Sequence, residues 1–71
     1  MAAVMTPRRI GAVIRRLRTR RGLTQDQLAA RSGLTQSGLS KLEAGERPNP
    51  GMTTLKKLAK ALDVPVGELL A

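Results

Sequence analysis

Three kinds of side chain are missing from this chain, and their absence excludes several classes of protein. The 71 residues include no cysteine and no histidine, so neither a disulfide nor the usual zinc sites can form. No aromatic residue occurs either, so the core must be built from Leu, Val, Ile, Ala and Met. Without aromatic rings, the bases of a single-stranded nucleic acid lack their usual stacking partners. We therefore expect a protein without a metal or another cofactor.

Groups that carry catalysis are also scarce. The chain has only 5 carboxylate side chains and no His, Cys or Tyr, which leaves no credible acid–base pair or nucleophile. No glycine-rich loop of the kind that cradles phosphates is present. No apolar run is long enough for a signal peptide or a membrane span. These absences predict a cytoplasmic protein that is not an enzyme.

Positive charge, in contrast, is abundant. Lys and Arg total 13 against 5 acidic residues, a formal net charge of +8. Residues 1–31 contain eight arginines, and Asp26 is the only acid among them. Such an asymmetry favours a polyanionic partner, and the lack of aromatic side chains makes duplex DNA the better candidate. A solvated basic surface is the alternative that charge alone leaves open.

The hydrophobic pattern predicts an all-α domain that spans residues 1–71. A first helix is expected from Thr6 or Pro7 to about Arg21, with Thr6 as its N-cap. Its apolar stripe has helical spacing and consists of Ile10, Val13, Ile14 and Leu17. Four further helical segments are expected at about 25–31, 36–44, 52–62 and 65–70. A loose tail, Met1–Met5, and a proline-containing loop, 46–51, complete the five-helix organisation.

Residues 22–45 carry the most informative pattern, GLTQDQLAARSGLTQSGLSKLEAG. Thr24 and Thr35 are each placed to cap a helix, and Gly33 stands at a tight turn that needs a positive φ. The leucines that such a helix pair would bury are Leu28, Leu34, Leu39 and Leu42. A chain with this arrangement presents its second helix to the major groove of DNA.

The same residues resemble a known family. From Leu23 to Gly45 the chain reads LTQxxLAxxxGxxxxxLSxxExG, which resembles the Cro and phage-repressor (XRE-like) helix-turn-helix family. The segment Leu55–Leu62, then Val-Pro-Val and Glu-Leu, resembles the fourth and fifth helices of that family. The resemblance covers about residues 9–70. It implies a compact five-helix domain of the lambda-repressor-like type.

The helix at 36–44 is expected to read the bases. Its outward side carries Gln36, Ser37, Ser40 and Lys41. Glutamine can bond adenine through N6 and N7, and lysine can donate to O6 and N7 of guanine. Matching these positions to the family motif implies base contacts from Gln36, Ser37 and Lys41, with Ser40 close behind. Gly38 departs from the larger polar residue often found at its position, and a plainly solvated face is the alternative.

Phosphate contacts are expected from residues on either side of this helix. Gln25 lies in a first helical turn, where free backbone amides and the helix dipole favour an anion. The resemblance implies that Gln25 touches a phosphate and helps to brace the base-reading helix. Thr24 is a second candidate, although capping alone explains it. Arg47 and Asn49 follow on the proline loop, where the family contacts the DNA backbone, and Asn49 could instead satisfy its own turn.

The resemblance also implies an ion pair between Arg18 and Glu43. This assignment makes Glu43 a structural brace rather than a catalytic acid. The other clustered arginines of the first helix cannot all reach one duplex, so some of them must only raise the positive potential of the protein surface. That cluster consists of Arg15, Arg16, Arg20 and Arg21.

Pattern and resemblance together predict a sequence-specific duplex-DNA-binding transcriptional regulator, a repressor acting by occupancy. Because one domain reads few base pairs, we expect a homodimer on an inverted repeat. Its candidate dimer surface is either Val66, Leu69 and Leu70 or the apolar tail, Met1–Met5. The alternative is a protein-interaction module, such as an antitoxin or small adaptor. A membrane-bound first helix is disfavoured because its apolar stripe is needed for the core and aromatic anchors are missing.

Overall fold

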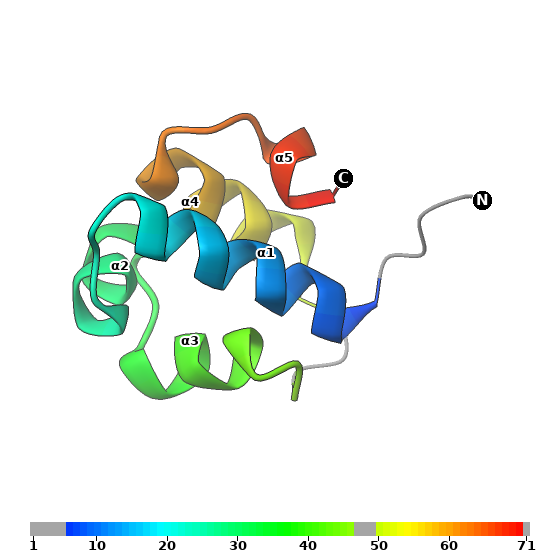
Figure 1. Ribbon diagram of the computed structural model, residues 1–71, viewed down its shortest axis with the longest axis horizontal. Coiled ribbons are helices and arrows are strands. Elements are labelled where there is room, and N and C mark those ends of the chain that lie inside the picture. Colours follow the sequence, from blue (N-terminus) through cyan, green and yellow to red (C-terminus); the bar gives the residue numbers. More distant parts are fainter. Residues whose placement is uncertain (1–5, 47–49, 71) are drawn as a thin grey trace.

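The computed structural model describes residues 6–46 and 50–70, which form five helices and no strand (Figure 1). The helices are α1 (Pro7–Arg20), α2 (Gln25–Ser32), α3 (Gln36–Glu43), α4 (Met52–Leu62) and α5 (Val66–Leu70). The predicted all-α fold is confirmed, and each helix boundary lies within one residue of its expected position. The expected tail, Met1–Met5, and the loop residues 47–49 lie outside the described residues.

Threonines begin the first three helices, as the sequence predicts. Thr6, Thr24 and Thr35 each have an extended backbone, and each side chain accepts a hydrogen bond of 3.0–3.1 Å from the N–H three residues later. At Thr24 the cap is reciprocal, because its own N–H donates to Gln27 Oε1 at 2.9 Å. Gly33 has a φ of 73°, which confirms the tight turn between α2 and α3.

All five helices contribute side chains to one hydrophobic core. The predicted stripe of α1 is buried except for Val13, which packs against the core while half-buried. The helix pair α2–α3 buries three of its four predicted leucines, and Leu34 packs against them. Because α5 is only five residues long, its attachment relies on Leu69, which is 1% exposed. Within the described ranges, no helix has the length and hydropathy that crossing a bilayer requires.

The longest helix, α1, lies between α3 on one side and α5 on the other (Figure 1). Helix α2 packs against both α3 and α4, and α4 continues through a short turn into α5. Helix α3 therefore lies at the edge of the molecule, supported by α1 and α2. This arrangement leaves the outer face of α3 open to a partner.

The approach of α1 to α3 is so close that it requires glycine at two positions. A Cβ atom on Gly11 would collide with the carbonyl oxygen of Leu42 and would lie 2.9 Å from that of Glu43. At Gly45, whose φ is 75°, a Cβ atom would lie 3.0 Å from Cα of Arg8. The position of α3 is thus set partly by backbone-to-backbone contact, which only a residue without a side chain allows.

We predict that Gly11→Ala destabilises the domain, although alanine favours a helix by about 1 kcal/mol over glycine. The new methyl group must displace backbone carbonyl groups of α3, so the free energy of unfolding should fall by about 1–3 kcal/mol. Urea unfolding followed by circular dichroism measures this change.

The matched control is Gly67→Ala in α5, where a Cβ atom would meet nothing within 4 Å. This variant should be neutral or more stable by up to about 1 kcal/mol. Equal effects of the two substitutions would contradict the close approach at Gly11.

Candidate nucleic-acid interface

The outer face of α3 carries the four side chains predicted to meet bases. Gln36, Ser37 and Lys41 are exposed, and Ser40 is half-buried. On the opposite face, Leu39 and Leu42 are 0% and 2% exposed and lock the helix against the core. The result is a row of hydrogen-bonding groups on a helix that is held firmly from behind.

An ion pair joins α1 to the end of α3, as the family resemblance implies. Arg18 Nε donates to Glu43 Oε2 at 2.7 Å, and Arg18 Nη2 donates to Oε1 at 3.0 Å. The two side chains are only 15% and 3% exposed. Arg18 Nη1 also donates to the carbonyl oxygen of Leu23 at 2.8 Å. One guanidinium group thereby connects α1, the segment leading into α2, and α3.

The partnership with Glu43 also affects the protonation of Arg18. The hydrogen bond to the Glu43 carboxylate raises the pKa of Arg18, burial lowers it, and the Coulomb attraction of Glu43 raises it further, with a net upward shift. A raised pKa stabilises the folded state at every pH below the ordinary pKa of arginine, and that stabilisation is lost only in strong base. Arg18 is therefore a permanent charge rather than a pH-sensitive group.

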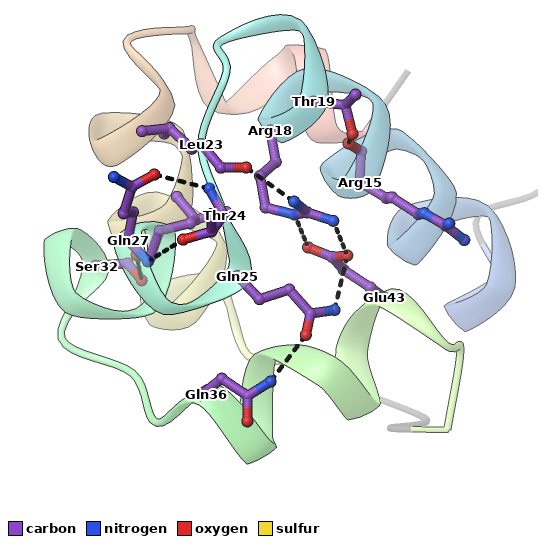
Figure 2. A network of polar contacts seen from close by, with 11 residues as sticks. Arg15, Arg18, Thr19, Leu23, Thr24, Gln25, Gln27, Ser32, Gln36 and Glu43 are labelled. Atoms are coloured by element: carbon purple, nitrogen blue, oxygen red, sulfur yellow. Dashed lines mark hydrogen bonds and ion pairs between the residues drawn. The ribbon is translucent and has the colours of Figure 1, made fainter.

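The Arg18–Glu43 pair is extended by two glutamines to the first residue of α3 (Figure 2). Gln25 Nε2 donates to Glu43 Oε1 at 3.2 Å, and Gln36 Nε2 donates to Gln25 Oε1 at 2.9 Å. Because an ionised carboxylate can only accept, Gln25 must turn its nitrogen toward Glu43 and its oxygen toward Gln36. The buried ion pair therefore orients the exposed Gln36 amide.

This orientation leaves Gln36 with one free N–H and a free carbonyl oxygen. A donor and an acceptor side by side match the N7 and N6–H₂ groups of adenine in the major groove. The bond between the two glutamines is absent from the sequence-based prediction. A signal for it exists, since each glutamine stands directly after a capping threonine at the start of consecutive helices.

The remaining predicted site residues fall into three groups. Thr24 caps α2 through Oγ1, which agrees with the capping explanation of this residue. Arg47 and Asn49 lie outside the described residues. Among the residues predicted to form a dimer surface, Val66 and Leu70 are half-buried. Leu69, however, is buried in the core of its own chain, so the prediction that it leaves apolar area uncovered is wrong.

The fold, the capped turn and the exposed α3 face define a helix-turn-helix domain. The helix-turn-helix family model HTH_3 matches residues 14–69, which is most of the chain. The chain belongs to this family, and the resemblance to XRE-like proteins seen in residues 23–45 is confirmed.

Individual proteins show the same relationship. The HTH-type transcriptional repressor RghR of Bacillus subtilis (strain 168) is 45% identical over 60 residues, which cover 84% of this chain and 44% of RghR. This chain spans 40–44% of the length of three relatives from that bacterium.

Solved structures agree closely with this one. The restriction-modification controller protein C.AhdI from Aeromonas hydrophila has a TM-score of 0.85 and 41% identity, over 89% of this chain and 94% of its own. The master regulator for biofilm formation SinR, known from Bacillus subtilis and crystallised in complex with DNA, has a TM-score of 0.84 and 35% identity. That match covers 87% of this chain and 98% of the SinR chain.

We predict that Arg18→Met lowers the free energy of unfolding by about 3–5 kcal/mol, because the Glu43 carboxylate would stay buried without its partner. Replacing both residues, as Arg18→Met with Glu43→Leu, should recover more than half of that loss. Urea unfolding of the variants, analysed as a double-mutant cycle, tests both statements.

The matched control is Arg21→Met at the end of the same helix. Arg21 Nη1 lies 3.9 Å from Asp63 Oδ2, Arg21 Nη2 donates to the exposed carbonyl oxygen of Asp63 at 3.2 Å, and the two side chains are 45% and 93% exposed. Removing this exposed pair should cost only about 0–1 kcal/mol. If Arg18→Met and Arg21→Met lower the free energy of unfolding by similar amounts, the buried pair has no special role in stability.

Proposed function

We propose that this protein is a sequence-specific, duplex-DNA-binding transcriptional regulator that places α3 in the major groove. The observation that carries the proposal is the hydrogen-bonded chain from the buried ion pair through Gln25 to Gln36. A solvated surface glutamine has no need of such support, whereas a base-reading glutamine gains specificity from a fixed orientation. Membership of the helix-turn-helix family supports the same function.

In the proposed complex, each residue on the α3 face has a distinct task. Gln36 bonds one adenine with its free N–H and its carbonyl oxygen, and Lys41 donates to O6 and N7 of a guanine. The short hydroxyls of Ser37 and Ser40 contact either a base edge or a phosphate. Gln25 keeps its second amide N–H free for a phosphate, because its first N–H and its oxygen are already bonded.

Further phosphate contacts complete the proposal. Thr24 offers its hydroxyl hydrogen, since its oxygen already accepts the capping bond. We also propose that Arg47 and Asn49, in the loop after α3, contact the sugar–phosphate backbone of DNA. Contacts of this kind set the position of the domain on DNA, whereas those from α3 select the sequence.

We further propose that the protein acts as a homodimer on an inverted repeat and represses by occupying its operator. A single α3 face reads only a few base pairs, and two-fold symmetry doubles the site. With Leu69 buried, the candidate dimer surfaces are the partly exposed Val66 and Leu70 or the apolar tail, Met1–Met5. RghR, a related protein, is named as a repressor, which supports repression.

Selection of bound duplexes from a random pool tests this function. We expect an enriched inverted repeat, and we expect Gln36→Ala to relax one position in each half-site. Losing a two-bond contact to adenine costs about 1–3 kcal/mol, or about 5- to 150-fold in affinity for the preferred base.

The matched control is Gln27→Ala, because the Gln27 side chain bonds to the N–H of Thr24 and should affect stability only. It should leave the selected sequence unchanged. If the unmodified protein enriches no sequence at moderate salt, the proposal fails, and the protein-interaction module becomes the better explanation.

A further inference from the structure

The arginines of α1 fall on two flanks of the helix. Helix α1 lies between α3 and α5, so one flank borders the candidate DNA interface and the other borders α5 (Figure 1). Arg8 and Arg15 are seven residues apart and therefore share one side of the helix. Arg16 and Arg20 are displaced from that side by their position in the helical turn. The sequence predicts that only some of these arginines reach DNA, and the structure separates them.

Arg8 and Arg15 lie on the flank that borders α3. Arg15 lines a hollow together with Gln25, Ser40 and Ala44, so it lies next to α3. The backbone of Arg8 lies against Gly45, the residue that follows the C-cap of α3. Both arginines also line one continuous groove along the outer surface of α1, with Ala44 at its α3 edge.

Arg16 and Arg20 line the same groove but also reach toward α5. Arg16 lines a second hollow with Val13 and Glu68, and Arg20 lines a third hollow with Val64 and Glu68. Glu68, which belongs to α5, therefore lines both of these hollows, and Arg9 lines the first of them as well. Its negative charge offsets the positive potential on the flank that faces away from α3.

On the α3 flank, no acid other than Glu43 lines the groove among the described residues, and the exposed Glu46 follows Gly45 just beyond it. The Glu43 carboxylate is bonded to Arg18 and Gln25. Within the groove itself, no second acid among the described residues offsets the positive charge of Arg8 and Arg15. This difference in local charge, added to the difference in position, distinguishes the two flanks.

The geometry of a duplex gives this flank a partner. A helix in the major groove, which is about 12 Å wide, has a phosphate backbone on each side. The axes of packed helices lie about 8–10 Å apart. When α3 enters the major groove, α1 therefore lies over one of the two phosphate backbones of the duplex. Arg8 and Arg15 are seven positions apart and so about 10.5 Å apart along the helix axis, or about three nucleotides of one strand at 3.4 Å each.

Building on the DNA-binding function proposed above, we infer that Arg8 and Arg15 form a phosphate-contacting row that extends the DNA interface from α3 onto α1. Arg16 and Arg20 make no phosphate contact and contribute only to the general potential. The row adds affinity without reading sequence, because phosphates are the same at every base pair.

The test compares Arg15→Gln with Arg16→Gln, neighbouring variants that remove the same charge from exposed positions of one helix. Affinity for the selected duplex is measured between about 50 and 200 mM salt. Each lost phosphate contact reduces the slope of log affinity against log salt by about 0.9. Over this salt range, the affinity of each protein falls by some factor. For Arg15→Gln that factor should be about 3- to 4-fold smaller, per bound protomer, than for the unmodified protein.

Arg8→Gln should behave like Arg15→Gln, whereas Arg16→Gln and Arg20→Gln should keep the slope of the unmodified protein. The selected sequence should be the same for all four variants, and Arg15→Lys should restore the slope. Thermal unfolding of each variant checks that it is folded at the assay temperature.

Two failures can be told apart. If the unmodified protein selects a sequence but Arg15→Gln and Arg16→Gln change the slope equally, the row on α1 is refuted while the DNA-binding function stands. If the unmodified protein selects no sequence, the proposed function fails, and the inference fails with it.

Discussion

The buried ion pair between Arg18 and Glu43 is the interaction on which the rest of the interface depends. A carboxylate that is 3% exposed is tolerable only with a charged partner and saturated hydrogen bonds, and Arg18 and Gln25 supply them. The same bonds determine which way the Gln25 amide turns, and that in turn orients Gln36. A requirement of folding, the neutralisation of a buried charge, thus becomes a means of orienting an exposed side chain.

Neutralising Glu43 has a second consequence, which concerns long-range electrostatics. Because Arg18 balances its charge, the Glu43 carboxylate does not cancel the positive charge of the arginines that line the groove along α1. The close backbone contact at Gly11 brings this groove next to the proposed base-reading face. Packing and charge therefore cooperate, since the helix that buries the apolar stripe also presents arginines beside the surface that would meet a duplex.

Local features of the fold could be predicted because short-range physics decides them. A threonine before a helix can accept an N–H three residues on, and the glycine of a tight turn can adopt a positive φ, whatever lies elsewhere in the chain. Apolar residues at helical spacing face the core for a similar reason. The bond between Gln25 and Gln36 and the role of Gly11 could not be predicted in this way, because each depends on the distance between two different helices. The burial of Leu69 could not be predicted for the same reason, since it requires α5 to pack against the rest of the core.

The sequence by itself determined the helices, their caps, the helix-turn-helix pattern and the excess of positive charge. It also indicated that Arg18 and Glu43 pair, through the resemblance to a family. Only the tertiary structure decided which arginines of α1 lie beside α3, which apolar residues of α5 stay partly exposed, and which way the Gln36 amide turns. The physical reason is that propensity and periodicity act within about one or two helical turns, whereas electrostatic and hydrogen-bonding partners are chosen by how whole helices pack.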